Sequence, residues 1–270
     1  MKKIISFIMS VFVAVSSVGC EKKSDKYPDF TVEFLNVGKA DCMVMYTENS
    51  TVIIDCGEKG DGKKILELLE EKGIESVDYL IITHYDKDHV GGAAKVINNV
   101  EVKNVLAPDY EENSDEVDKY IKALDSKNIT PVRMTEDISF TLDNVQYTVY
   151  APKGTYDNDN DFSLVTKAVY HDTSFLFTGD AMYRRLDEIM DTGKCTLLKV
   201  PYHARRIENL GEFLNNVKPQ YAVACTSEEE FSDDTKNLLE KFNINYYSTC
   251  FNGDITAVSA GNKINISSEK

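Results

Sequence analysis

Four side chains of types that bind metal ions lie within one short stretch of the chain. They are His84, Asp86, Asp88 and His89, so two of the four histidines in the 270-residue sequence fall within six residues. Imidazole and carboxylate groups are ligands of catalytic divalent metals, which keep one position open for water. The stretch therefore predicts the core of a metal-dependent hydrolytic site.

The chemistry that such a site supports is hydrolysis. A divalent ion lowers the pKa of a bound water molecule, so that hydroxide exists near neutral pH, and it polarises the group under attack. In a tight loop alternate residues can point the same way, so His84, Asp86 and Asp88 could face one cavity, with His89 joining them. The alternative is a polar loop in which Asp88 caps a helix.

The flanking residues predict that this stretch lies at the end of a strand. Residues 79–82 form an apolar run typical of a buried strand, and the pair Gly91-Gly92 opens a helix over 93–98. Four further polar residues follow strand-like runs in the same way: Asp41, Asp55, Asp180 and His203. We expect Asp41 and Asp55 to brace neighbouring loops by accepting hydrogen bonds from backbone amides.

Strands, hairpins and helices alternate through both halves of the chain. Asp143-Asn144 signals one hairpin, and a second turns at His171, which we expect on the surface. The polar segment 153–161 between the hairpins is typical of a solvated loop. Sheets packed together with helices outside, an α/β (α+β) class, fit this pattern.

The N-terminus has the features of an export signal. Lys2 and Lys3 precede an apolar run that is too short for a membrane span, and Gly19 precedes Cys20. We expect a signal peptide over 1–19 and a lipid anchor on Cys20, followed by a tether over 20–28 and one domain over 29–268. The product would be a membrane lipoprotein that faces outward. A secreted chain or an uncleaved N-terminal anchor is the alternative.

The net charge restricts which partners the chain can bind, and the cysteines indicate whether disulfides or zinc stabilise it. Removal of Lys2 and Lys3 with the leader would take the formal net charge from −15 to −17, which disfavours long nucleic acids as partners. Five cysteines follow Cys20, without CxxC spacing, which favours buried thiols over a zinc knuckle or a disulfide framework.

Six segments of the chain resemble the motifs of one known family. They are HYDKDHVGG at 84–92, FLNVGKAD at 34–41, VIIDCG at 52–57, NDFSLV at 160–165, SFLFTGD at 174–180 and LKVPYH at 198–203. The first resembles the HxHxDH signature of the metallo-β-lactamase fold. The others resemble the motifs FLDVGQGD, ILIDAG, NxxSLV, SFLFTGD and LKVxHH. These motifs occur in the hydrolase domain of ComEC-like competence proteins and in the stand-alone secreted relatives of that domain.

The resemblance implies a four-layer αββα sandwich with one or two metals at the edge of the paired sheets. It implies that His84 and Asp86 hold one metal, that Asp88 and His89 hold the second, and that Asp180 bridges them. His203 would bind the second metal or donate a hydrogen bond to the developing oxyanion. Asp88 and His203 are thus the expected catalytic residues, and Asn160 of the NxxSLV-like segment is an expected substrate-binding residue.

The chain also departs from the family pattern. Asp86 replaces a histidine, Tyr202 stands where the first histidine of HH is expected, and Ala204 replaces a glycine. We expect zinc as the divalent ion, with manganese or magnesium as alternatives, since a set rich in carboxylates shifts the preference towards these harder ions.

The leading hypothesis is an exported hydrolase whose metal-bound hydroxide attacks a phosphoester, most simply a small or short phosphodiester. Lys199, Arg205 and Arg206 flank His203 and could clamp a phosphate, or could be solvated surface charges. The alternatives are a lactone or ester hydrolase and a non-catalytic lipoprotein that binds a ligand or partner, because one fold supports several functions.

Overall fold

The computed structural model describes residues 29–270. The predicted signal peptide at 1–19 and the tether at 20–28, with Cys20, lie outside these residues. Between residues 29 and 270, no helix combines the length and the apolarity that crossing a membrane requires.

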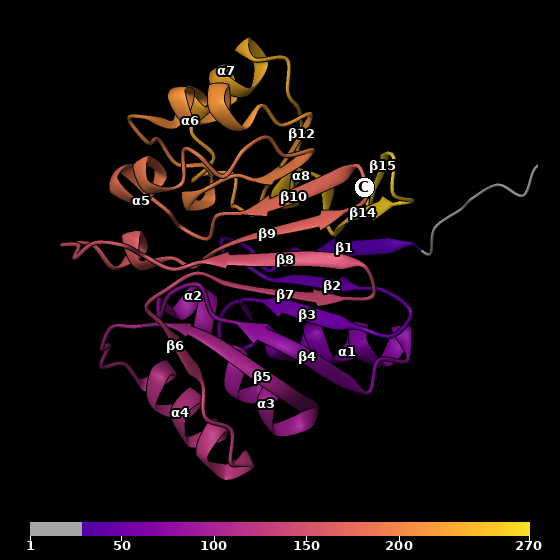
Figure 1. Cartoon of the computed structure of the whole chain (residues 1–270), viewed down its shortest axis with the longest axis vertical. Coiled ribbons are helices and arrows are strands. Elements are labelled where there is room, and N and C mark those ends of the chain that lie inside the picture. Colours follow the sequence, from indigo (N-terminus) through magenta and orange to yellow (C-terminus); the bar gives the residue numbers. More distant parts are fainter. Residues whose placement is uncertain (1–28) are drawn as a thin grey trace, which may run out of the picture.

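The first sheet has eight strands, and most of them come from the N-terminal half of the chain (Figure 1). Their bounds are β1 Phe30–Phe34, β2 Met43–Tyr46, β3 Thr51–Ile54, β4 Ser76–Ile81, β5 Glu101–Pro108, β6 Val132–Met134, β14 Ile255–Ser259 and β15 Ile264–Ser268. The order across the sheet is β15-β14-β1-β2-β3-β4-β5-β6. Strands β3 to β6 run parallel to one another, so their carboxyl ends share one edge.

The second sheet has seven strands in the order β13-β12-β11-β10-β9-β8-β7. Their bounds are β7 Ile138–Leu142, β8 Val145–Tyr150, β9 Val165–Tyr170, β10 Thr173–Phe177, β11 Leu197–Lys199, β12 Tyr221–Ala224 and β13 Asn245–Ser248. Strands β10 to β13 are parallel, so this sheet also gathers strand carboxyl ends at one edge.

Helices cover the outer face of each sheet. Helices α1 (Gly62–Lys72), α3 (Ala93–Asn99) and α4 (Asp115–Lys127) lie beyond the first sheet, and α5 (Tyr183–Glu188), α6 (Leu210–Val217) and α7 (Asp233–Lys241) lie beyond the second (Figure 1). The short helical turns are α2 (Lys87–Val90), α8 (Thr249–Asn252), η1 (Asp159–Phe162) and η2 (Tyr202–Ala204). This arrangement confirms the predicted four-layer αββα sandwich.

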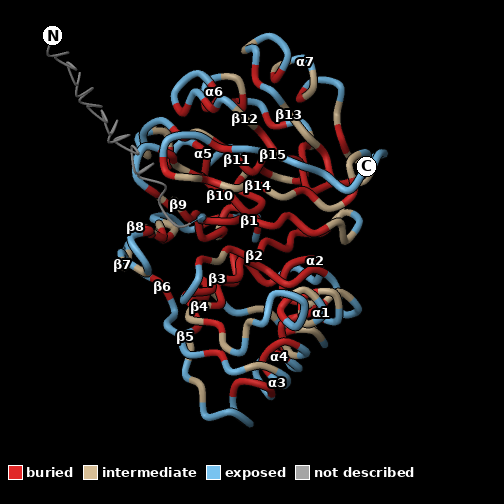
Figure 2. Tube along the Cα trace, turned by 90° about the vertical axis from the view of Figure 1, so that its right-hand side faces the viewer, coloured by how far each residue is buried: buried red, intermediate tan, exposed pale blue. Residues whose placement is uncertain are grey.

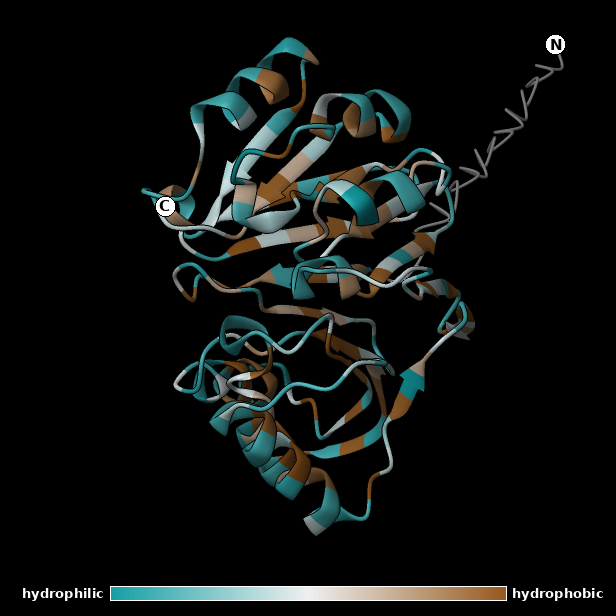
Figure 3. Ribbon diagram, turned by 90° about the vertical axis from the view of Figure 1, so that its left-hand side faces the viewer, coloured by the Kyte–Doolittle hydropathy of each residue, from teal (hydrophilic) through white to brown (hydrophobic). Residues whose placement is uncertain are grey.

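The layers are held together by three apolar cores. One fills the space between the sheets and the other two lie between each sheet and its helices. The alternation of side chains along a strand explains this division: in β1, Phe30, Val32 and Phe34 all face the other sheet. Buried residues accordingly concentrate along the central strands (Figure 2), whereas the helices combine an apolar inner face with a polar outer face (Figure 3).

The turns that link the strands largely follow the sequence signals. Asp143 and Asn144 have φ of 44° and 66°, the left-handed values that a two-residue hairpin turn requires, and His171 is exposed at the second hairpin. The prediction of a solvated loop over 153–161 is wrong at its end. Asn160 and Asp161 are buried in η1, because Asp161 accepts hydrogen bonds from the amides of Met182 and Arg185.

Candidate metal centre

Four strand ends bring the predicted site residues together. Asp55 directly follows β3, and His84 follows the parallel neighbour β4. In the second sheet, Asp180 follows β10 and His203 follows its parallel neighbour β11. The apolar runs fix these strands in the two sheets, and their carboxyl ends meet where the sheets face one another.

The loop that carries the histidines is held by backbone hydrogen bonds. The amide of Cys56 donates to the carbonyl of His89 (2.8 Å), and the amide of Asp41 donates to the carbonyl of Asp88 (3.1 Å). Gly92 makes this approach possible, because a Cβ there would lie 2.2 Å from the carbonyl oxygen of Cys56. Helix α2 is a single turn that places Asp88 and His89 at the centre and Val90 in the core between the first sheet and its helices.

The candidate ligands of the described residues form four overlapping groups of three, and within each group the ligand atoms lie within 4.8 Å of one another. Two contain predicted ligands alone: His84, His89 and Asp180, and Asp88, His89 and His203. The other two include Asp41, in one case with Asp180 and His203 and in the other with Asp55 and His89. His89 therefore belongs to three of the four groups, whereas the resemblance implied that it serves one metal. Asp86 lies outside all four and is exposed, with Oδ2 3.5 Å from Nε2 of His84.

The donor atoms fit a divalent cation. Nε2 of His84 and Oδ1 of Asp180 are buried and have no hydrogen-bond partner within residues 29–270. Nε2 of His89 and Nε2 of His203 face each other at 3.3 Å. Buried nitrogen and oxygen atoms without hydrogen-bond partners lower the stability of the fold unless an ion binds them. These residues therefore suit a metal site.

Supporting contacts fix the orientation of two histidine rings. Nδ1 of His89 lies 2.7 Å from Oδ2 of Asp55, which also accepts a hydrogen bond from the hydroxyl of Thr83 (2.6 Å). Nδ1 of His203 lies 3.0 Å from the carbonyl oxygen of Cys225. Both rings therefore present Nε2 to the centre. Oδ1 of Asp55 accepts a hydrogen bond from the amide of Thr83 (2.8 Å), which confirms its expected loop-bracing role. The same expectation is wrong for Asp41, whose carboxylate pairs with Lys199 and accepts no amide hydrogen bond within residues 29–270.

The backbone around His203 and Asp55 is strained. Tyr202, His203 and Ala204 have φ of 50°, 49° and 60° in succession, and Asp55 has φ of 57°. Residues other than glycine adopt such values at a cost, and these conformations concentrate at functional sites. Here the strained turn directs the His203 ring into the centre.

The histidines and carboxylates of the centre stabilise one another in their charged forms. Burial opposes the charge on His203, but Asp180 and Asp88 outweigh burial and raise its pKa to about 9. Burial is likewise outweighed for His89, whose pKa Asp180 and Asp55 raise well above the ordinary value. Metal binding must displace protons from these rings, so it will depend on pH.

Lys199 does not have the predicted role of a phosphate clamp. Its side chain is fully buried, with Nζ paired to Asp41, 2.9 Å from the carbonyl oxygen of Gly179 and 3.6 Å from Oδ1 of Asp180. Burial lowers its pKa, but Asp41 and Asp180 outweigh burial and hold that pKa above its usual value. Lys199 is therefore an internal counter-ion of the centre, out of reach of a substrate.

The two arginines beside His203 already have carboxylate partners. The guanidinium of Arg205 donates to both carboxylate oxygens of Glu230 and, at 3.1 Å, to the hydroxyl of Tyr202. Nε of Arg206 lies 3.0 Å from Oδ2 of Asp234 on the exposed surface. Arg205 thus lies beside the centre, but Glu230 already balances its charge.

Asn160 lies in η1 beside the Asp180 loop. Its Nδ2 is 3.6 Å from Sδ of Met182, and its Oδ1 has no hydrogen-bond partner within the described part of the chain. The same segment holds the loop, since Oγ of Ser163 accepts a hydrogen bond from the amide of Asp180 (3.1 Å). Its role in substrate binding stays a prediction.

Lys39 is a residue of the site that sequence reasoning missed. Its Nζ lies 3.1 Å from Oδ2 of Asp88, and 35% of its side chain is exposed. In the sequence it stands in a turn, and only its place two residues before Asp41 could have drawn attention to it.

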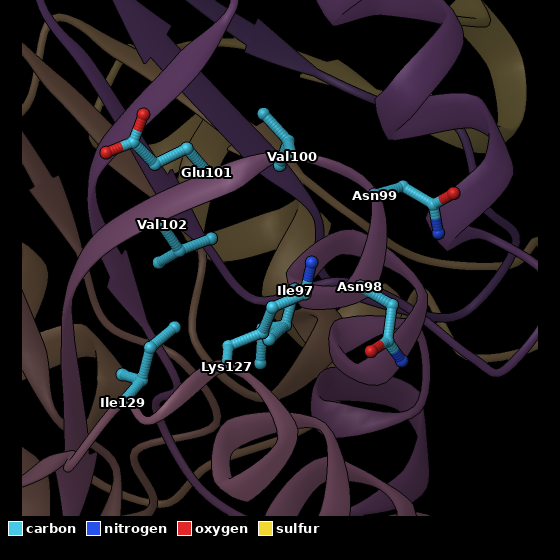
Figure 4. Close-up of a pocket in the computed structure, with 8 residues that line it drawn as sticks. All are labelled: Ile97, Asn98, Asn99, Val100, Glu101, Val102, Lys127 and Ile129. Atoms are coloured by element: carbon cyan, nitrogen blue, oxygen red, sulfur yellow. The ribbon is translucent and has the colours of Figure 1, made fainter.

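A hollow of about 420 Å³ lies elsewhere, between the end of α3, the start of β5 and the end of α4 (Figure 4). Its charged lining residues are Glu101 and Lys127, and none of the candidate ligands lines it. Since β5 begins here and His84 follows the end of the parallel strand β4, the hollow lies at the opposite edge of the sheet.

Comparison with known proteins agrees with this geometry. The family model of the metallo-beta-lactamase superfamily matches residues 35–228. ComE operon protein 3 of Bacillus subtilis (strain 168) is 24% identical over an alignment of 277 positions, gaps included, which covers 93% of this chain and 34% of that protein. The chain thus spans about a third of the length of this curated relative.

Solved structures share the fold at low sequence identity. The metallo-beta-lactamase fold protein YhfI from Bacillus subtilis superposes with a TM-score of 0.60 at 12% identity, over 82% of this chain and 96% of YhfI. A diphosphatase from the PhnP family superposes with a TM-score of 0.51 at 11% identity, over 81% of this chain and 94% of that one. With its two sheets and its converging histidines and aspartates, the chain belongs to the metallo-beta-lactamase superfamily of hydrolases, and ComEC-like competence proteins are among its relatives.

Proposed function

We propose that the chain is a metal-dependent phosphoesterase that hydrolyses a small or short phosphodiester. The observation that carries the proposal is the convergence of His84, His89 and Asp180 with Asp88 and His203. In the described part of the chain, Nε2 of His84 and Oδ1 of Asp180 are buried there without a hydrogen-bond partner. The diphosphatase of similar fold adds support, since its name describes a phosphate-releasing enzyme.

A divalent ion bound there would acidify a water molecule and take up negative charge from a phosphoryl oxygen. The ion is zinc, manganese or magnesium, in one or two copies. The residues of the chain orient the histidine rings towards the ion. Asp55 fixes the ring of His89, and the carbonyl of Cys225 fixes that of His203, so each ring directs Nε2 inward.

His203 could act in either of two ways. Its Nδ1 is occupied by the carbonyl of Cys225, and its Nε2 lies 3.0 Å from Oδ2 of Asp180 and 3.4 Å from Oδ2 of Asp88. Without a proton, Nε2 is a metal ligand. With a proton, it donates a hydrogen bond to the oxygen that gains charge as the phosphoester is attacked.

The overall charge favours a short substrate. The chain has 45 acidic and 30 basic residues, so its field repels a long polyanion. A short phosphodiester carries little charge and needs only a local cation at the site.

The test is a substrate panel with the purified protein loaded with zinc, manganese or magnesium. We expect turnover of bis-p-nitrophenyl phosphate with at least one metal and loss of turnover in Asp180→Asn. The control is Asp172→Asn, because Asp172 is exposed in the β9–β10 turn, outside the centre.

Two results would contradict the proposal. Cleavage of a lactone or a carboxylic ester with no cleavage of any phosphodiester would favour the lactone or ester hydrolase. A folded protein that takes up no metal and cleaves none of these substrates would favour a binding protein.

We also propose that the chain is exported, with residues 1–19 as the leader, Cys20 as the lipid-bearing residue, 20–28 as the tether and 29–268 as the domain. The Lys2-Lys3 pair and the apolar run before Gly19-Cys20 support this. Expression of the full chain in a bacterium should give a membrane-bound form that Cys20→Ala releases to the soluble exported fraction. Retention of the wild-type protein in the cytosol would contradict it.

A further inference from the structure

The cations around the metal centre differ in their access to solvent. Lys199 is fully buried, and the charge of Arg205 is balanced by two hydrogen bonds to Glu230. Lys39 alone among these three combines a partly exposed side chain with contact to a candidate ligand, since its Nζ lies 3.1 Å from Oδ2 of Asp88. Of these three cations, Lys39 is thus the one that reaches both solvent and a candidate ligand.

The backbone that carries Lys39 is fixed to the metal loop. The amide of Leu35 donates to the carbonyl of Cys42 (3.0 Å) across the base of the turn, and Asp41 is bonded to Asp88 through the backbone. Gly38 has φ of 73°, which turns the chain, and no atom lies within 4 Å of a Cβ built there. The turn is thus anchored at its base and open on its outer side.

Lys39 shares its partner with the expected metal. Asp88 belongs to the ligand group with His89 and His203 and is also the ion-pair partner of Lys39. A divalent cation at Asp88 would repel the ammonium and compete with it for the carboxylate. The displaced ammonium would still lie at the mouth of the centre, because the turn is anchored.

Among residues 29–270, the ion pair of Lys39 is with Asp88. The charge of Lys39 also acts on Glu230, whose pKa is lowered mainly by a hydrogen bond from Arg205 and to a smaller extent by Lys39 and His203. Since Arg205 occupies both oxygens of that carboxylate, Lys39 is left with a charge that an anionic ligand can match.

We propose that Lys39 binds the anionic phosphoryl oxygens of the substrate, and that in the metal-free protein it competes with the divalent cation for Asp88. The substrate part rests on the proposed phosphoesterase function. It makes Lys39 a specificity-determining residue that distinguishes an anionic phosphoester from a neutral ester.

The experiment compares Lys39→Met and Lys39→Arg with Lys87→Met. Lys87 is a matched control, because it lies next to Asp88 in the sequence but is well exposed and 3.7 Å from Glu58. Manganese affinity of the metal-free proteins is measured by chelator competition, inorganic phosphate affinity of the metal-loaded proteins by calorimetry, and KM and kcat with bis-p-nitrophenyl phosphate.

We expect Lys39→Met to bind manganese several-fold more tightly, because a competing cation is lost. It should bind phosphate about tenfold more weakly and raise KM about tenfold, with kcat changed by less than about threefold. Lys39→Arg should retain phosphate binding, and Lys87→Met should match the wild type in all three measurements.

The outcomes separate this inference from the proposed function. If the wild type hydrolyses the diester and Lys39→Met has unchanged phosphate affinity and KM, the role of Lys39 is overturned and the function stands. If the wild type cleaves no diester yet binds phosphate through Lys39, the function fails and the anion site stands. Equal manganese affinity in Lys39→Met and the wild type would overturn the competition for Asp88.

Discussion

His89 is the residue whose side chain contacts the largest number of the other described groups at the centre. Asp55 lies 2.7 Å from its Nδ1, and its Nε2 faces His203 at 3.3 Å and Oδ1 of Asp180 at 3.5 Å. It belongs to three of the four ligand groups. The orientation of this one ring therefore determines whether those groups can act together.

Loss of the Asp55 carboxylate should weaken metal binding although Asp55 is not expected to be a ligand. In Asp55→Asn the ring of His89 loses its charged partner, and such supporting groups typically contribute about 10–100-fold to metal affinity. Chelator competition with zinc or manganese measures this effect. Affinity equal to that of the wild type, with Asp172→Asn as the control, would contradict the positioning role.

The pKa of His203 predicts how stability depends on pH in the metal-free protein. Its pKa rises from 6.5 unfolded to about 9 folded, so the folded state binds the proton more tightly. The stabilisation, on the order of 3 kcal/mol, is present in full below about pH 6.5 and is lost as the pH rises through about 9.

Thermal or urea unfolding in the presence of a chelator, between pH 6 and 10, measures this dependence. The free energy of unfolding should fall over that window, and His203→Gln should reduce the slope. Stability that is constant or rises with pH would show that the carboxylates do not hold His203 protonated.

At the residue scale, the sequence identifies ligands that are close together in the chain. The types and spacing of His84, Asp88 and His89 are sufficient to predict a metal centre. The burial of Lys199 could not be predicted, because its partner Asp41 is distant in the sequence and a lysine is rarely buried without a partner. The exposure of Asp86 was missed because a loop does not alternate as a strand does.

At the scale of elements, close packing between glycines joins the metal loop to the first helix. The amide of Gly92 donates to the carbonyl of Gly57 (3.1 Å), and a Cβ on Gly62 would lie 2.6 Å from the carbonyl oxygen of Gly92. This contact brings the segment after Asp55 against the loop of His89, so that backbone packing positions the two side chains.

Substitution of Gly92 should therefore affect both stability and metal binding. In Gly92→Ala the new methyl group meets the Cys56 carbonyl oxygen at 2.2 Å, and we expect a loss of roughly 3 kcal/mol in unfolding free energy with weaker metal binding. Gly60→Ala is the control, since no atom lies within 4 Å of its Cβ, and it should change stability by less than about 0.5 kcal/mol. Urea denaturation measures the unfolding free energy of both variants, and equal values for Gly92→Ala and Gly60→Ala would contradict the packing argument.

The sequence predicts elements best where a local signal determines them. Asp143-Asn144 fixes a hairpin, and Ser114 caps α4 by accepting a hydrogen bond from the amide of Val117 (3.3 Å). Strand β5 has no such signal, because Lys103 and Asn104 face solvent and interrupt the apolar pattern. Its pairing with β4 stabilises it as a strand, and that pairing is not visible in the local sequence.

At the scale of the whole molecule, aromatic residues join the two sheets. The ring of Phe30 in β1 lies 5.2 Å from that of Phe175 in β10 and 5.7 Å from that of Tyr170 in β9, measured between centroids. These contacts lie in the middle core, where both sheets are packed on each other. The relative position of the two sheets, and hence the meeting of Asp180 with His89, depends on this core.

Truncation of Phe30 should accordingly destabilise the entire sandwich. We expect Phe30→Ala to lose about 3–5 kcal/mol of unfolding free energy, through lost burial and a cavity between the sheets. Phe251→Ala should change it by less than about 0.5 kcal/mol, because Phe251 is 49% exposed. Chemical denaturation of both variants is the measurement. A Phe30→Ala variant as stable as the Phe251→Ala variant would contradict the role of the middle core.

The four layers could be predicted from the sequence only through the family resemblance. Apolar patterning indicates sheets with helices outside, but it does not determine that β14 and β15 join the first sheet beside β1. That pairing links the C-terminal strands to the N-terminal ones, across nearly the whole chain. Such long-range contacts depend on packing that a local sequence pattern does not contain.

The central claim is that the strand ends of the two sheets form a divalent metal site. The direct measurement is elemental analysis of the protein after saturation with zinc or manganese and removal of unbound metal. We predict one or two equivalents per chain in the wild type and in Asp172→Asn, and a marked loss in Asp180→Asn. A folded wild-type protein that retains no metal, or an Asp180→Asn variant that retains as much as the wild type, would contradict the account.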